Sequence, residues 1–130
     1  MSQVVDFLNE AKTYYLATVE DGQPRVRPFG AAVEYKGRVY LTTGNHKKVY
    51  KQLIANPKTE ISGMAKGKWI RLSGEAVFDD SIEAKQAMFD ANPSLKNLYS
   101  IDDGIFEVFY LENMQALVYS FNGEPVALEN

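Results

Sequence analysis

Residues 42–48, which read TTGNHKK, combine hydroxyl, amide and ammonium groups around a single glycine. We expect the chain to leave a strand here, turn at Gly44 and enter a helix near Lys47. Backbone N–H groups, two ammonium groups and the positive end of the helix dipole would then meet, and these are the groups that bind a phosphate. The alternative interpretation is that Lys47 and Lys48 are a solvated pair at a surface turn.

A second candidate binding segment reads RVRPFG over residues 25–30. Strand alternation puts Arg25 and Arg27 on one face, where two guanidinium groups repel each other unless they are solvated or paired with an anion. Pro28 removes one N–H donor from the ladder, which leaves neighbouring backbone groups free to contact a ligand. The alternative is an exposed edge strand protected by its charges.

The third candidate is Trp69, the only tryptophan of the chain. It lies near the start of an expected strand, and its neighbours on the same strand face are Gly67 and Arg71 rather than apolar residues. An indole in such a place can cover a flat ligand or a partner chain. The alternative is an ordinary core or interface aromatic residue.

Residue counts exclude several kinds of active site. The chain has no Cys and one His, His46, which excludes a disulfide, a thiolate zinc site, a Cys nucleophile and a His-rich metal site. The sequence contains no Gly-x-Ser-x-Gly turn, glycine-rich dinucleotide loop or P-loop. The acidic pairs at 79–80 and 102–103 lie beside turn residues, which predicts capping or solvation. We expect no metal site and assign no catalytic acid or base.

Composition is typical of a globular chain. The 130 residues are 45% hydrophobic and 24% charged, which fits a single domain over residues 1–130. The net charge of -3 argues against a broad basic face for nucleic acid. Apolar runs stay well below the roughly 20 residues that span a bilayer, and the first residues do not resemble a signal peptide. We therefore expect a cytoplasmic protein without nucleic-acid or membrane partners.

Periodicity and turn residues outline the elements that must position these groups. The expected strands lie at 13–19, 25–34, 38–43, 59–65, 68–78, 105–111 and 114–121. The expected helices lie at 4–12 with Ser2 as N-cap, at 47–55, and at 82–92 after a cap at Asp80-Ser81, with a short helical turn at 94–99.

Short links between strands favour antiparallel pairing, so the fold class is mainly β. We expect a six- to seven-stranded, mostly antiparallel barrel with two or three helices. A hairpin of residues 25–34 with 38–43, turning at Lys36-Gly37, would bring Arg27 level with the Gly44 turn. The two basic segments would then form one phosphate site.

Three segments in this order resemble the pyridoxamine phosphate oxidase-like family of FMN-binding split barrels. They read YYLATVEDGQPRVRPFG, GRVYLTTGNHKKVYKQLIANP and WIRLSGEAVF. The resemblance runs from about Val4 to Phe78, and the strands expected at 105–121 fit the family's closing strands. It implies a split barrel in which two chains pair and FMN lies in a groove at their interface.

The resemblance also implies which residues bind the cofactor. The strand that carries both arginines would hold the phosphate and run beside the isoalloxazine, the next strand would end beside the ring, and the lysine pair would bind the phosphate. His46 shares the turn before the lysines without an assigned role. The implied FMN-binding residues are Arg25, Val26, Arg27, Pro28, Leu41, Thr42, Thr43, Asn45, Lys47, Lys48 and Trp69.

Two departures from the oxidase pattern bear on the substrate. The oxidase carries a substrate-binding lysine where this chain has about Gly30, and its longer C-terminal region has a Trp and an Arg-x-His pattern. This chain instead ends in SFNGEPVALEN. We therefore expect a substrate other than vitamin B6 phosphate.

The expected function is that of a homodimeric, FMN-dependent oxidoreductase acting on an unidentified small molecule, with NADH or NADPH as candidate electron donor. One alternative is a protein that binds or stores FMN, or another flat cofactor, without catalysis. A second is a haem-binding relative, for which His46 at a basic turn is a poor axial ligand because such a ligand belongs in an apolar pocket.

Overall fold

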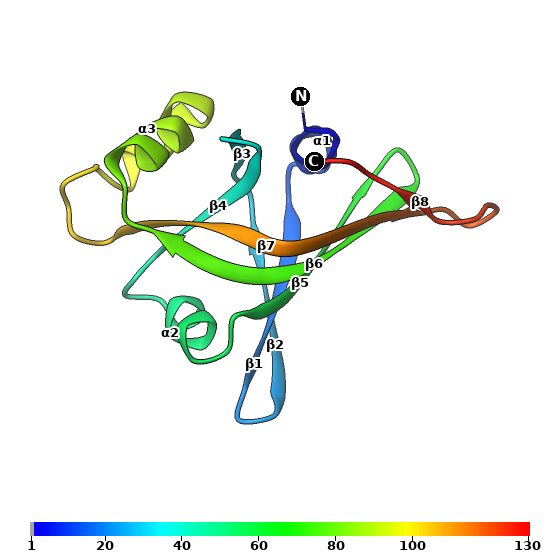
Figure 1. The fold of residues 1–130 in the computed structure, drawn as a ribbon, viewed down its shortest axis with the longest axis horizontal. Coiled ribbons are helices and arrows are strands. Elements are labelled where there is room, and N and C mark those ends of the chain that lie inside the picture. Colours follow the sequence, from blue (N-terminus) through cyan, green and yellow to red (C-terminus); the bar gives the residue numbers. More distant parts are fainter. Residues whose placement is uncertain (1) are drawn as a thin grey trace.

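The computed structural model describes residues 2–130, which form eight strands, three α-helices and one 3-10 helix (Figure 1). The strands are β1 (Tyr14–Glu20), β2 (Gln23–Phe29), β3 (Ala32–Tyr35), β4 (Arg38–Gly44), β5 (Lys58–Ala65), β6 (Lys68–Asp79), β7 (Phe106–Tyr119) and β8 (Val126–Ala127). The helices are α1 (Gln3–Ala11), α2 (Lys48–Ala55), α3 (Ile82–Ala91) and the 3-10 helix η1 (Pro93–Asn97).

One antiparallel sheet contains all eight strands in the order β2-β1-β5-β6-β7-β4-β3, with β8 added to β7. Figure 1 shows β6 and β7 running side by side along the molecule, with the β1–β2 hairpin running across them. The end strands β2 and β3 are joined by two residues of chain. The mainly β, antiparallel fold class is therefore confirmed as that of a split barrel.

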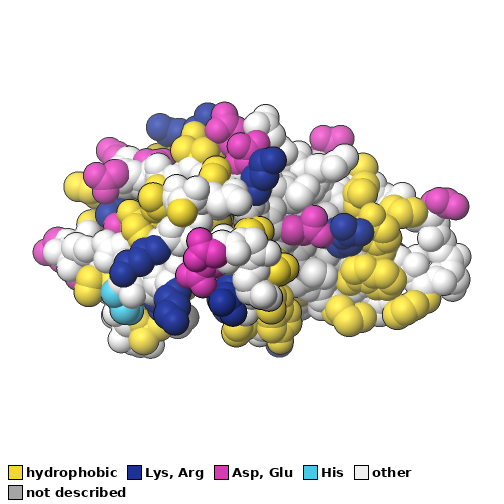
Figure 2. Space-filling model, turned by 90° about the horizontal axis from the view of Figure 1, so that it is seen from below, with side chains coloured by type: hydrophobic (Ala, Val, Ile, Leu, Met, Phe, Trp, Pro, Cys, Tyr) yellow, Lys and Arg dark blue, Asp and Glu magenta, His cyan; other side chains and the backbone are white. Residues whose placement is uncertain are grey.

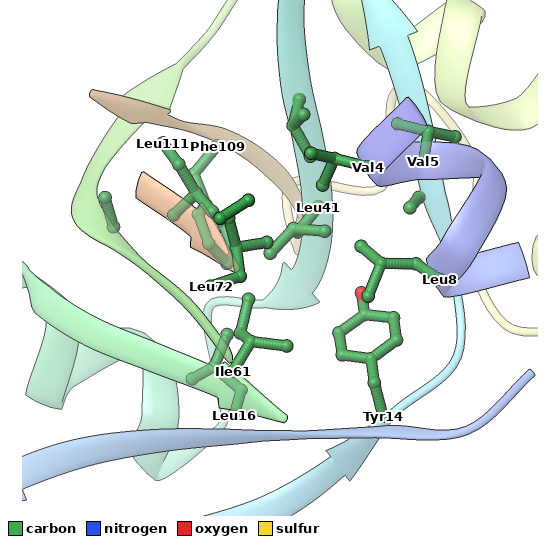
Figure 3. Close-up of a cluster of buried hydrophobic side chains, with 14 of the residues drawn as sticks. Val4, Val5, Leu8, Tyr14, Leu16, Leu41, Ile61, Leu72, Phe109 and Leu111 are labelled. Carbon is green, nitrogen blue, oxygen red and sulfur yellow. The ribbon is translucent and has the colours of Figure 1, made fainter. Parts of the chain in front are cut away.

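The core lies inside the curved sheet and is closed at one end by α1. Figure 3 shows Leu16, Ile61, Leu72 and Phe109 of four strands pointing toward one another and toward Leu8 of α1. These side chains have almost no solvent exposure, and burial of this kind is the main favourable term in folding. The Ser2 hydroxyl accepts the N–H of Val5, which confirms the predicted N-cap.

A second apolar cluster fixes α3 against β4 and β7. The rings of Phe89 and Phe106 stack with their centroids 4.4 Å apart, and Met88 is buried beside them. The predicted cap is also present, since Ser81 accepts the N–H of Ala84. Because η1 follows α3 directly, this packing also fixes the position of η1.

The prediction of a single strand at 25–34 is wrong, because this segment forms parts of two strands, β2 and β3. β2 pairs only with β1, so Arg27 lies opposite Leu16 instead of level with the Gly44 turn. Pro24 and Pro28 lack the N–H that a second neighbour would need, which confines β2 to an edge. The expected hairpin survives only as β3 with β4.

The expected strands at 105–111 and 114–121 are one strand, β7, so this prediction is also wrong. Asn113 has φ 54°, and the register between β6 and β7 shifts opposite it, between Ser73 and Glu75. A β-bulge therefore absorbs the turn-forming residues Glu112-Asn113 without reversing the chain. The short β8 was not predicted.

In the part of the chain that the structure describes, no helix is long and apolar enough to cross a membrane. Within residues 2–130, His, Asp and Glu side chains do not gather in the groups of three that would hold a metal ion.

Candidate functional site

The start of α2 carries two cations where a helix usually carries anions. Lys47 is the N-cap residue and Lys48 the first helical residue; both are exposed, and the first turn holds no acidic side chain. The Lys47 side chain does not cap the helix. The backbone dipole and two ammonium groups therefore place positive charge at the same point.

Arg27 is held beside this helix start by acceptors from two elements. Its Nη1 donates to the carbonyl oxygen of Leu16 at 3.2 Å and to Oγ1 of Thr18 at 2.8 Å, and its Nη2 donates to Oε1 of Gln52 at 2.5 Å. Thr18 and Gln52 are buried, and the Thr18 hydroxyl also donates to Gln52. The guanidinium is thereby fixed between β1 and α2.

The three acceptors of Arg27 are all neutral, so they orient its charge without cancelling it. Burial lowers the pKa of Arg27 and the negative charge of Glu20 partly opposes this, yet an arginine remains protonated in proteins. Among the ion pairs formed within residues 2–130, none involves Arg27, Lys47 or Lys48. Arg25 differs, because its Nε lies 3.3 Å from Glu20.

These cations line a groove of about 410 Å³ between β2 and the start of α2. Figure 2 shows Lys and Arg side chains gathered beside the histidine on this face of the molecule. We call it the cationic groove; its lining residues are Glu20, Arg25, Val26, Arg27, Lys47, Lys48, Val49 and Gln52.

A second cavity, of about 350 Å³, adjoins the cationic groove and shares Arg27, Lys47 and Val49 with it. We call it the η1 hollow, because η1 and the residues after it form one wall. Its other lining residues are Pro28, Phe29, Gly30, Ala31, Thr42, Thr43, Asn92, Ser94, Leu95, Leu98 and Tyr99. The two spaces therefore adjoin at Arg27 and Lys47, two of the basic residues of the groove.

Not every residue predicted from the family resemblance lines one of these two spaces. Thr42 and Thr43 line the η1 hollow, whereas the Leu41 side chain is fully buried in the core. The Asn45 amide donates to the carbonyl oxygen of Gly104 at 2.8 Å and to the Glu107 carboxylate at 2.9 Å. Asn45 therefore ties the turn to the strand opposite and lines neither space.

The Cα of Gly44 is closely approached by the ends of two side chains. A Cβ there would lie 2.6 Å from Cε1 of His46 and 2.9 Å from the hydroxyl of Tyr99. The ring of the exposed His46 therefore lies over Gly44 at the turn.

Trp69 lies away from the cationic groove within this chain. It pairs with Met64 and Tyr119, its ring stacks on Tyr119 with centroids 5.8 Å apart, and Phe121 packs against it at 4.9 Å. The register of β2, β1, β5, β6 and β7 puts the exposed Tyr15, Val26 and Met64 and the half-buried Trp69 and Tyr119 on this outer side of the sheet, and Phe121 packs on Trp69 just after β7. We call this set the apolar face: Tyr15, Val26, Met64, Trp69, Tyr119 and Phe121.

Sequence reasoning missed the residues that act through long-range contacts. Thr18 and Gln52 gave no signal as partners of Arg27, although Gln52 lies one helical turn after Lys48. Leu95, Leu98 and Tyr99 were expected only as part of a short helical turn. Their place on the η1 hollow depends on the packing of α3.

The chain matches the family model of pyridoxamine 5'-phosphate oxidase over residues 1–110. No curated protein matches it. A solved structure of a NimC/NimA family protein from Clostridium acetobutylicum is 52% identical with a TM-score of 0.92, and the match covers 97% of this chain and 91% of that one.

Two more distant structures share the fold. A heme binding protein from Mycobacterium smegmatis is 20% identical with a TM-score of 0.73, over 94% of this chain and 57% of that one. A pyridoxamine 5'-phosphate oxidase-related, FMN binding protein from Nostoc punctiforme is 17% identical with a TM-score of 0.63, over 92% and 87%.

Proposed function

The chain belongs to the pyridoxamine 5'-phosphate oxidase family, and we propose that it binds FMN in the cationic groove and uses it to oxidise or reduce a small molecule. The observation that carries this proposal is the orientation of the Arg27 side chain and the lack of a charged partner among its acceptors. Its guanidinium is oriented by neutral acceptors beside two lysines that form no ion pair within residues 2–130.

The donor set of the groove fits a phosphate ester. A phosphomonoester carries a charge of about -1.5 to -2 at pH 7. Hydrogen bonds from Arg and Lys to such an anion are stronger than hydrogen bonds between neutral groups. Arg27, Lys47 and Lys48 would hold that group, together with the N–H groups at the start of α2. Arg25 would join them by giving up its exposed ion pair with Glu20, which is worth little.

The η1 hollow fits the flat part of the same ligand where it meets the groove. Thr42 and Thr43 would lie beside the ring, with Val49 and Phe29 as apolar contacts. Bound FMN would supply the hydride or electron transfer, while the chain orients the ring and limits its contact with water. Support comes from the Nostoc punctiforme protein of the same fold, which is described as FMN binding.

We also propose that two chains pair through the apolar face. Val26, Met64 and Phe121 are 67%, 57% and 84% exposed, and exposed apolar side chains of this kind mark interaction sites. The Glu60–Arg71 ion pair lies between Val26 and Met64 on the same side of the sheet. The two-fold dimer is the commonest symmetric assembly, and it would let Trp69 of each chain reach the groove of the other. Trp69 would then contact the flavin across the interface, as the family resemblance implies.

A protein that only binds FMN is the alternative within this proposal. It is favoured by one observation: His46, the only histidine of the chain, lies exposed at the turn. The same exposure argues against haem, although a heme binding protein shares the fold.

The absorbance spectrum of the purified protein, followed by titration with FMN, tests the proposal. We expect flavin bands and tight binding of FMN, with riboflavin binding more weakly because it lacks the phosphate. Reduction of the bound flavin by NADH or NADPH, and its reoxidation by a candidate acceptor, would distinguish an oxidoreductase from a storage protein. Absence of binding at saturating FMN would refute the proposed function.

A further inference from the structure

Residues 100–105 connect η1 to β7, and they are hydrogen-bonded to the turn that carries the lysines. We call these residues the Asp103 loop. Resting on the proposed function, we propose that Asp103 is a positioning residue of its phosphate site. Asp103 orders the loop, and the loop in turn holds Asn45 in the turn before α2. Asp103 itself lies outside the described lining of the cationic groove and of the η1 hollow.

The Asp103 carboxylate accepts three backbone N–H groups from the two ends of its loop. Oδ2 accepts from Ser100 at 3.0 Å, and Oδ1 accepts from Ile105 at 2.8 Å and from Phe106 at 2.9 Å. The N–H of Phe106 is the main reason why the pKa of Asp103 is lowered from its usual value. The carboxylate is therefore ionised at neutral pH, and charge-assisted bonds of this kind are the strong ones.

Asn45 joins this loop to the turn before α2 by two bonds. Its backbone N–H donates to the carbonyl oxygen of Ile105 at 2.9 Å, and its side-chain amide donates to that of Gly104 at 2.8 Å. Gly104 has φ 71°, which favours glycine and gives the loop its sharp bend next to Asp103. The direction of both carbonyl groups, and with it the position of Asn45, therefore depends on the bonds to Asp103.

The turn that contains Asn45 also positions the lysines. The N–H of Lys47 donates to the carbonyl oxygen of Gly44 at 3.1 Å, so residues 44–47 form one hydrogen-bonded turn. Lys47 is the N-cap residue of α2, and Lys48 is its first residue. A displacement of Asn45 would therefore move both ammonium groups and the N–H groups at the start of the helix. These are the groups that the proposed function assigns to the phosphate.

The test compares Asp103→Asn with Asp102→Asn, which removes the same charge from the neighbouring residue. Asp102 is exposed, and its carboxylate accepts from the Ser100 hydroxyl at 3.1 Å. An amide at position 103 offers one acceptor oxygen in place of two, so the N–H groups at the two ends of the loop can no longer both be satisfied. Removing a negative charge by itself favours the binding of an anion, so a purely electrostatic role predicts the opposite change.

We expect Asp103→Asn to bind FMN about five- to tenfold more weakly than the unmodified protein, with riboflavin affinity changed by less than about twofold. Asp102→Asn should bind FMN as tightly as the unmodified protein or more tightly. If Asp103→Asn binds FMN as Asp102→Asn does, or loses FMN and riboflavin affinity equally, the inference is overturned and the proposed function remains intact.

The variant Asn45→Ala interrupts the same route from the other side and keeps every bond to Asp103. It should also lower the ratio of FMN affinity to riboflavin affinity, and an unchanged ratio would overturn the inference even if Asp103→Asn did not fold. When the two substitutions are combined, the loss of FMN affinity should be smaller than the sum of the single losses. Additive losses would mean that Asp103 does not act through Asn45.

Amide hydrogen exchange tests the first step without a cofactor. In the cofactor-free protein, the N–H of Asn45 should exchange faster in Asp103→Asn than in the unmodified protein or in Asp102→Asn. Exchange at Leu72 in the core reports the overall stability and serves as the control. Equal exchange at Asn45 in all three proteins would overturn the inference. Failure of the unmodified protein to bind FMN would refute the proposed function, and exchange at Asn45 would still decide whether Asp103 fixes the turn.

Discussion

Arg27 and Gln52 join two elements that are distant in the chain, since Nη2 of Arg27 on β2 donates to Oε1 of Gln52 on α2 at 2.5 Å. The bond fixes the guanidinium before any ligand arrives and fixes α2 relative to β2. Because the acceptor is an amide, the positive charge remains available. Such preorganisation reduces the conformational entropy that is lost when a ligand binds and orders the side chains of its site.

Gln52→Glu should convert this site into an internal ion pair. A carboxylate would bond Arg27 more strongly than the amide does and would cancel its charge, so FMN should bind roughly tenfold more weakly. Calorimetric titration measures the change, and riboflavin affinity is the control, which should change little. An unaltered FMN affinity would mean that the charge of Arg27 does not contact the phosphate.

Lys48→Ala should remove one charge-assisted contact with the phosphate. A loss of about 1.5–3 kcal/mol corresponds to roughly ten- to a hundredfold weaker binding of FMN, with riboflavin much less affected. Lys51→Ala is the matched control, because Lys51 is an exposed lysine of the same helix outside the described lining of either space. Equal losses for FMN and riboflavin would contradict a phosphate contact.

Met64→Glu should weaken the proposed dimer. It places a charge in the apolar face beside Trp69, and burying an unpaired carboxylate is costly enough to raise the dimer dissociation constant by about a hundredfold. Ile82→Glu is the control, because Ile82 is comparably exposed but lies on α3. Sedimentation of both variants gives the answer, and equal dimer stability would place the interface elsewhere.

The fluorescence of Trp69 should report the cofactor. Since the chain has no other tryptophan, FMN added to the cofactor-free protein should strongly quench the emission if the partner brings the indole to the groove. The quenching should be lost in monomeric Met64→Glu. Unchanged emission of the unmodified protein at saturating FMN would return Trp69 to the role of a structural aromatic residue.

Tyr40→Phe should destabilise the protein in a pH-dependent way. Burial alone raises the pKa of Asp79, but hydrogen bonds from the Tyr40 hydroxyl, at 2.7 Å, and from Ser81 hold that pKa below its usual value. The ionised Asp79 carboxylate therefore stabilises the folded protein above its unfolded-state pKa of about 3.9. This contribution to the free energy of unfolding is lost as pH falls through the lower folded-state pKa of Asp79.

We therefore expect Tyr40→Phe to cost about 1–3 kcal/mol at pH 7 and less as the pH falls below about 4. Urea unfolding across pH 2.5–7, about the range in which the carboxylate titrates, measures it. In an Asp79→Asn background the cost of Tyr40→Phe should no longer vary with pH. A pH-dependent cost in that background would assign the effect to another group.

Local signals predicted much of the fold and the cationic part of the site. The caps at Ser2 and Ser81, the Lys36-Gly37 turn and the lysines before α2 each depend on a few neighbouring residues, and the structure agrees with them. The structure also brings Arg25, Arg27, Lys47 and Lys48 into one groove, by a different route from the expected hairpin. Their role toward FMN stays a prediction.

What the sequence did not reveal depends on distant contacts. The bulge in β7 lies opposite Gly74 of β6, and a Cβ at Gly74 would come within 3.1 Å of Leu111. The residues Glu112-Asn113 are typical of a turn, and only their pairing with β6 shows that they form a bulge within one strand. Gln52 becomes a partner of Arg27 only after α2 packs on β1. The proposed contact of Trp69 with the groove of a partner depends on pairing between two chains, which no local pattern in the sequence describes.

The strand β7 also determines the order in which the cationic groove and the η1 hollow can assemble. It pairs with β4, where Gly44 meets Phe106, and with β6, so it connects chain segments that are far apart in sequence. Closing such a long loop is slow, whereas the β1–β2 hairpin and α2 form from nearer contacts. During refolding the cations of the cationic groove should therefore gather before the η1 wall exists. A cofactor captured at that stage would be held by its phosphate while its ring was still open to water.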